Sequence, residues 1–183
     1  PQVSREFMEL NQGVSMTLQV RSSQQVADWI STQHFDIGFA AVAVSDPSIK
    51  TELLARSEMV CVLPPGHPLE NKELIEPLDL KDDIFISLGT EHRYKVDDAF
   101  ENAEVKRKML FDTQVSHIAC SYVLSGSGVS LVDPVTAISF IKQGLIVKPF
   151  SISIPFKYNL IYSATRPVSQ LALDFCKLLK IRL

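Results

Sequence analysis

The sequence has no run of about 18 consecutive apolar residues, the length at which a hydrophobic stretch can form a transmembrane helix. It also lacks a basic excess, because 18 Lys and Arg residues stand against 21 Asp and Glu residues, for a formal net charge of −3. Nucleic-acid binding depends largely on basic surfaces that neutralise phosphates. We therefore expect no membrane partner and no direct nucleic-acid contact from this chain. Residues 1–7 resemble no signal peptide and begin without Met, so we expect a piece of a longer protein.

Cysteine is scarce, and the three cysteines, Cys61, Cys120 and Cys176, lie in separate apolar stretches. An odd number of widely spaced cysteines favours buried, reduced thiols and a cytoplasmic location over a disulfide framework. Metal sites need clustered ligands, and the pair His117 and Cys120 would supply only two. We therefore expect no metal and no cofactor.

Apolar residues make up 46% of the 183 residues, enough for a substantial core. Short β-rich runs alternate with helical patterns, which is typical of an α/β protein with parallel strands. The runs predict strands over 17–20, 35–40, 52–63, 84–86, 108–111, 129–132, 145–150 and 157–163. Helices are predicted from Ser22, around 74–75, around 96–100, over 115–123, from Pro134 to Gly144, and over 171–179. The pattern fits two lobes, with lobe one at 1–62 plus 162–183 and lobe two at 63–161.

Small polar residues follow several predicted strands. Ser22 and Ser23 come after the first, Thr113 and Gln114 after 108–111, and Asp133 after 129–132. Ligands of open parallel sheets bind beyond the carboxyl ends of the strands, where helix N-termini favour anions. Each of these residues alone fits a helix cap. Together they predict a carboxylate-binding site.

No catalytic motif stands out. The segment 126–130, Gly-Ser-Gly-Val-Ser, matches neither the G-x-S-x-G nucleophile elbow nor, with Leu131, the G-x-G-x-x-G dinucleotide motif. We therefore expect no enzymatic activity. The basic cluster at 105–108 precedes a predicted strand, and we expect it to form a solvated sheet edge.

Three segments carry a resemblance to a known family: TLQVRSSQQVADWISTQHFDIGFA at 17–40, EMVCVLPPGHPL at 58–69 followed by PLDLKDD at 77–83, and VLSGSGVSLVDPVTA at 123–137. Their order and spacing resemble the effector-binding domain of LysR-type transcriptional regulators. Within that family, the sequence of these segments is most similar to the branch of lysine-biosynthesis and opine-catabolism regulators.

The resemblance implies two Rossmann-like lobes joined by two crossing strands, a type 2 periplasmic-binding-protein fold, with the first strand of lobe one missing from the chain. It implies an effector, a small anionic or zwitterionic metabolite such as an amino acid or its conjugate, held between the lobes. The contacts that it implies are Ser22, Ser23, Thr113 and Gln114, with Ser57 and Pro134 as weaker ones.

The resemblance further implies DNA binding through a missing N-terminal winged helix-turn-helix domain, a homodimer of this domain, and a homotetramer of the full-length protein. A periplasmic solute-binding protein of the same fold is the alternative. An enzyme on this fold is a second alternative, although no catalytic pair supports it.

Overall fold

The computed structural model describes residues 2–41, 45–89 and 92–182. The chain divides into two compact units, which we call unit 1 (1–55 and 157–183) and unit 2 (56–156). The chain passes from unit 1 to unit 2 within strand β2 (Ile49–Glu58) and returns within strand β8 (Pro155–Ser163). The divisions fall several residues before the expected boundaries at 62 and 161. The first division lies before residue 62 because strand β3 (Val60–Leu63) pairs with strands of unit 2 and therefore belongs to that unit.

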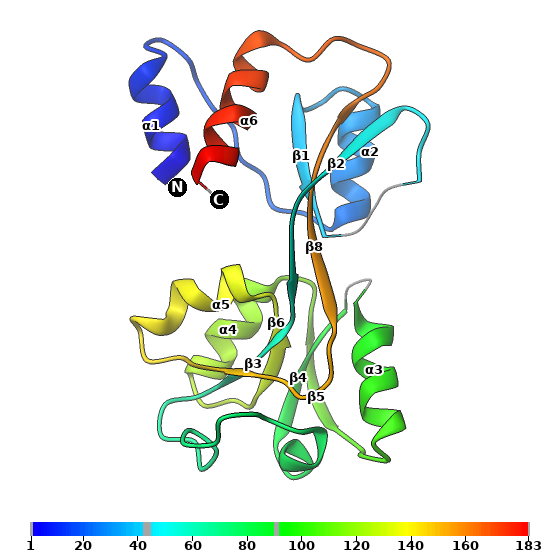
Figure 1. The fold of residues 1–183 in the computed structure, drawn as a ribbon, viewed down its shortest axis with the longest axis vertical. Coiled ribbons are helices and arrows are strands. Elements are labelled where there is room, and N and C mark those ends of the chain that lie inside the picture. The colour runs from blue at the N-terminus through cyan, green and yellow to red at the C-terminus, as the bar shows by residue number, and fades with distance from the viewer. Residues whose placement is uncertain (1, 42–44, 90–91, 183) are drawn as a thin grey trace. The chain divides into compact units, whose positions relative to one another are not determined.

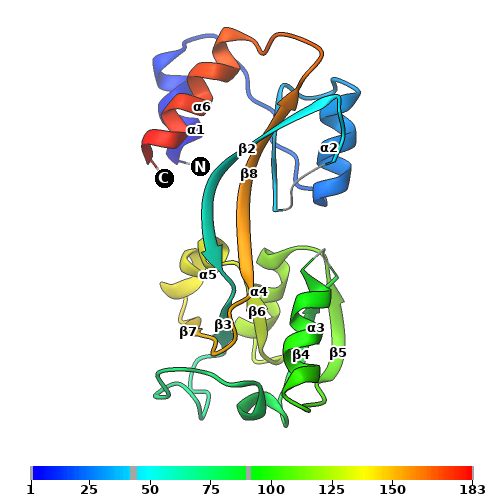
Figure 2. The ribbon, with the colours of Figure 1, turned by 45° about the vertical axis from the view of Figure 1, so that its right-hand side comes forward.

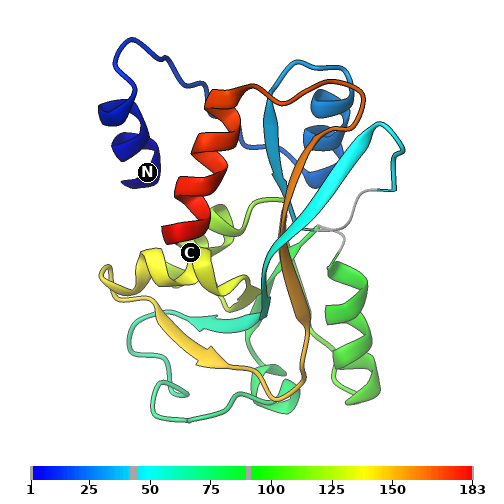
Figure 3. The ribbon, with the colours of Figure 1, turned by 45° about the horizontal axis from the view of Figure 1, so that its top comes forward.

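Unit 1 contains a three-stranded sheet in the order β1–β8–β2, where β1 is Ile37–Ala40. Helix α2 (Ser23–Ser31) lies beside β1 (Figure 1) and buries Ala27 and Ile30 against the sheet. Helix α1 (Gln2–Leu10) packs on α6 (Gln170–Arg182), and the two lie side by side (Figure 3). The ring centroids of Phe7 and Phe175 are 5.3 Å apart in an edge-to-face pair, which anchors this contact.

Unit 2 contains the strands β6 (Ser130–Val132), β3 and β7 (Ile146–Pro149) in the order β6–β3–β7, together with the parallel pair β4 (Ile84–Leu88) and β5 (Lys108–Thr113). Hydrogen bonds from Ile86 N to Val129 O and from Val129 N to Ile84 O join the two groups. Helix α3 (Arg93–Asn102) lies beside β4 and β5 (Figure 2). Helices α4 (Ser116–Leu124) and α5 (Pro134–Ile141) pack against each other, and Cys61, Val62 and Leu63 are fully buried.

Most predicted elements are present, but three expectations were wrong. The segment 17–20 belongs to no strand of the described chain, and Leu18 and Val20 are 78% and 63% exposed, because no neighbouring strand pairs with it. The segment around 74–75 is not a helix. Ile75 bridges to Phe150, and Pro77 instead begins the 3-10 helix η1 (Pro77–Leu80), a position that suits its fixed φ.

The third concerns strand direction. Among the described pairs the β4–β5 ladder is parallel, whereas β1–β8, β3–β6 and β3–β7 are antiparallel. The described ladders of the two three-stranded sheets are thus antiparallel, and the parallel arrangement that the sequence predicted is found in the β4–β5 ladder. Within the described residues, no helix combines the length and the apolar character needed to cross a membrane.

Candidate functional site

The parallel pairing of β4 and β5 brings the ends of both strands to one edge of unit 2. Leu88 lies opposite Thr113 in the ladder, and Gly89 N donates a hydrogen bond of 2.8 Å to Thr113 O. Asp112 lies opposite Ser87, one step earlier. Two chain segments 24 positions apart (89 and 113) thereby supply adjacent polar groups, as expected where parallel strands end.

An open hollow of about 440 Å³ lies at this edge, lined by Gly89, Arg93, Asp112, Thr113 and Gln114. Arg93 is the first residue of α3, so a guanidinium projects from the helix start beside the strand ends. The hollow therefore combines a guanidinium, a carboxylate, a hydroxyl and an amide. Those groups can bind the polar head of a small metabolite.

The two charged residues of the hollow bind each other. Arg93 Nη1 donates to Asp112 Oδ2 at 3.0 Å, while Arg93 Nε lies 3.8 Å from Asp97 Oδ2. The Arg93 and Asp112 side chains are 42% and 54% exposed. Exposed ion pairs contribute little to stability, so this pair can be broken at low cost.

Thr113 and Gln114, both predicted contacts, lie together in the hollow. The Thr113 hydroxyl accepts a 3.3 Å hydrogen bond from Val115 N, at the residue just before α4. A hydroxyl has a second lone pair and a proton, so this contact leaves it capacity for a ligand.

Ser22 and Ser23, the predicted contacts in unit 1, have structural roles at the start of α2. Ser22 is the N-cap, and its Oγ accepts a 3.4 Å hydrogen bond from Gln25 N, as expected for a helix cap. Ser23 Oγ accepts a 3.2 Å hydrogen bond from Ala41 N and so ties α2 to the end of β1.

Ser57 and Pro134 lie elsewhere. Ser57 is half-buried in β2, and Pro134 is half-buried at the first position of α5. Neither lines the hollow. Asp133 caps α5 as expected, since its Oδ1 accepts a 2.9 Å hydrogen bond from Thr136 N.

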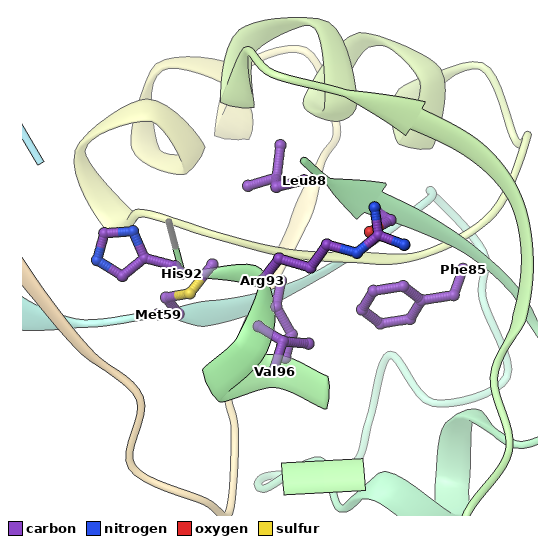
Figure 4. Close-up of a pocket in the computed structure, with 8 residues that line it drawn as sticks. Met59, Phe85, Leu88, His92, Arg93 and Val96 are labelled. Carbon is purple, nitrogen blue, oxygen red and sulfur yellow. The ribbon is translucent and has the colours of Figure 1, made fainter. Parts of the chain in front are cut away.

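A second, smaller space, which Arg93 also lines, lies between α3 and the sheet (Figure 4). It measures about 10 Å³, room for one water molecule at most. In Figure 4, His92 and Met59 lie together, while the Arg93 side chain extends away from His92. The His92 ring stacks on Phe156 with a centroid separation of 4.6 Å. This space is part of the packed interior and is too small for a metabolite.

Sequence reasoning did not include Arg93, Gly89 or Asp112 among the predicted contacts, although it predicted the strands over 84–86 and 108–111 that precede them. The available signal was an arginine at the start of the helix that follows a strand. That position directs a cation at the edge where parallel strands end.

The three thiols are free and buried. Burial raises the pKa of the Cys61 and Cys176 thiols, and it raises that of Cys120 to about 12. A thiol that stays protonated is a poor nucleophile and a poor metal ligand. In the part of the chain that the structure describes, no three His, Cys, Asp or Glu side chains cluster as a metal site would require.

Comparison with known proteins gives one family. The family model described as the LysR substrate binding domain matches residues 1–183. The Transcriptional activator protein LysR of Escherichia coli K12 is 36% identical over 178 residues, which cover 96% of this chain and 57% of that protein. The Regulatory protein NocR of Agrobacterium tumefaciens T37 is 30% identical over 175 residues, or 94% of this chain and 58% of that protein. The chain thus spans a little over half the length of these relatives.

The fold also matches solved structures. The regulatory domain of CcmR from Synechocystis PCC6803, solved in complex with 2-PG, has a TM-score of 0.82 at 18% identity. That match covers 100% of this chain and 89% of the CcmR chain. The fold is therefore the periplasmic-binding-protein-like type 2 fold that the resemblance implied.

Proposed function

The chain belongs to the LysR substrate binding domain family, and from this premise we propose that it is the effector-sensing part of a DNA-binding transcription regulator. Its effector is a small metabolite that carries a carboxylate, either anionic or zwitterionic. The hollow at the β4–β5 edge carries this proposal, because it places Arg93, Thr113 and Gln114 around a space of metabolite size.

In this proposal, the Arg93 guanidinium binds the effector carboxylate, since its planar fork matches the two carboxylate oxygens. Thr113 and Gln114 supply neutral donors and acceptors beside it. Ser22, Ser23, Ser57 and Pro134 remain proposed contacts from other parts of the chain. Ser23 Oγ accepts from Ala41 N and would reach a ligand through its remaining proton and lone pair. Ser22 Oγ accepts from Gln25 N and donates to Gln25 Oε1 at 3.3 Å, so it would give up that second hydrogen bond to donate to a ligand.

We propose that the signal is a shift between conformers of the domain. A ligand that binds one conformer more tightly than another raises its population, and coupling free energies of about 1–3 kcal/mol are typical. The shift reaches DNA through an N-terminal helix-turn-helix domain of a longer protein, in which the reduced thiols would suit a cytoplasmic location.

The proposed partner of this domain is a second copy of itself, and the full-length protein would form a homotetramer. Strand β5 and helix α4 support a self-association surface, because they leave Leu110, Phe111, Ile118 and Tyr122 between 41% and 69% exposed. Apolar patches of this kind are typical of interaction surfaces.

A thermal-shift screen tests the proposed function. The 183-residue chain is heated with amino acids, opines and small carboxylates without an amino group, since binding to the folded state raises its melting temperature. We expect at least one of these compounds to raise the melting temperature in a saturable way. Failure of every one at millimolar concentration would contradict an effector of this class, and turnover of a bound compound would favour an enzyme.

A further inference from the structure

We propose that the Arg93–Asp112 pair is the specificity element of the hollow and selects a zwitterionic α-amino-acid head group. The α-carboxylate would bind Arg93 and the α-ammonium would bind Asp112. This inference rests on the proposed function and names the ligand class of the same site.

The charge balance of the hollow favours a ligand with both charges. Its described lining contains one guanidinium and one carboxylate, whose nitrogen and oxygen lie 3.0 Å apart. A ligand with only a carboxylate would take Arg93 from Asp112 and leave two anions close together, and like charges at such a distance repel. A ligand that also carries an ammonium replaces one ion pair by two.

Gly89 keeps this arrangement open. A Cβ atom at Gly89 would lie 2.8 Å from Asp112 Oδ1 and 3.3 Å from Oδ2, closer than carbon and oxygen normally approach. The Asp112 carboxylate therefore occupies the space that a side chain at position 89 would need. Glycine at this strand end lets the carboxylate lie beside the guanidinium instead of pointing to solvent.

Both charged groups are accessible, yet both are held in place. Arg93 has a second carboxylate, Asp97, 3.8 Å from its Nε, which orients the guanidinium from the helix side. Asp112 lies in the β5 ladder opposite Ser87, which fixes its backbone. Preorganised charges lose little entropy on binding, so they can discriminate between ligands. Thr113 and Gln114, which are neutral, line the same hollow and remain for the rest of the ligand.

The experiment compares matched probes by calorimetry. Each L-amino acid that raises the melting temperature is measured beside its deamino acid and its decarboxylated amine, for instance L-norleucine with hexanoate and pentylamine. We expect the amino acid to bind at least about tenfold more tightly than either analogue, because each loses one charge-assisted contact. Equal or tighter binding of the deamino acid would overturn the head-group inference and leave the proposed function intact.

Two variants test whether the preference for the amino acid depends on the Arg93–Asp112 pair. Asp112→Asn should lower amino-acid affinity about tenfold. It should leave the affinity for the deamino acid unchanged or raise it, because the repulsion between the two carboxylates is removed. Asp98→Asn removes an exposed carboxylate of α3 that does not line the hollow, and it should change neither. Equal losses for both probes in Asp112→Asn would show a structural role and overturn the inference. Binding of carboxylates but of no amino acid would also overturn it, and binding of no probe would overturn the proposed function as well.

Discussion

The role of the Thr113 hydroxyl as a predicted ligand contact can be tested by replacing it with a methyl group. Thr113→Val keeps the shape and removes the hydroxyl, and we expect effector binding to weaken by about 1–3 kcal/mol, measured by calorimetry. Thr113→Ser keeps the hydroxyl and serves as the control. Because Thr113 Oγ1 also accepts from Val115 N, the measurement belongs well below the melting temperature of the variant. Unchanged effector affinity in Thr113→Val would show that the Thr113 hydroxyl does not contact the effector.

Ser22 has a defined structural role that a stability measurement detects. Its hydroxyl caps α2 through Gln25 N, so Ser22→Ala should lower the free energy of unfolding by about 1 kcal/mol. Urea unfolding provides the measurement, and Ser22→Asp, which retains a capping oxygen, should restore most of the loss. A loss of effector affinity at unchanged stability would instead favour the ligand contact that the resemblance implies.

At the scale of elements, Gly128 lets β6 approach β4. Its φ is +152°, and a Cβ atom there would lie 2.3 Å from Ile84 O, the carbonyl that accepts from Val129 N. Gly128→Ala should therefore separate the two strands and lower the free energy of unfolding by about 2–3 kcal/mol. Gly126→Ala is the matched control, because Gly126 has a φ of +81° but open space around it. Chemical denaturation of both variants checks the prediction, and equal losses would contradict it.

The basic cluster at 105–108 was expected to be solvated, and this expectation was wrong for one of its residues. Lys108 is exposed as expected, but the Arg107 side chain is only 6% exposed. Its guanidinium pairs with Asp97 and lies 4.9 Å from the ring centroid of Phe85 and 4.8 Å from that of Phe100. A partner carboxylate and two aromatic faces offset the desolvation of this cation. None of those partners is adjacent in sequence, so the cluster itself gave no sign of burial.

At the scale of the whole molecule, carboxylates that accept hydrogen bonds in the folded state make stability depend on pH. Hydrogen bonds from Arg182 lower the pKa of Glu6, those from Ser48 lower that of Asp46, and those from Lys177 and Gln170 lower that of Asp174. A carboxyl with a lowered folded-state pKa stabilises the fold above its unfolded-state pKa and loses that contribution as pH falls through the folded value.

We therefore expect the melting temperature to be nearly constant above about pH 5 and to fall below about pH 4. Differential scanning calorimetry across this range checks the direction. Arg182→Gln should raise the pKa of Glu6 toward its ordinary value of 4.5, which carboxyl-detected NMR can follow. A melting temperature that rises on acidification would contradict the prediction.

The sequence by itself determined most of the elements and the polar strand ends, because periodicity, caps and turn residues act over a few positions. It indicated the family through the order and spacing of three segments that resemble that family. It placed Thr113 and Gln114 together because they are adjacent on the chain. Only the tertiary structure decided that Arg93, Gly89 and Asp112 complete the same hollow, since strand pairing joins segments that local patterns treat as separate. Pairing also decided that 17–20 is no strand: an extended segment becomes a strand only when a neighbour satisfies its backbone groups.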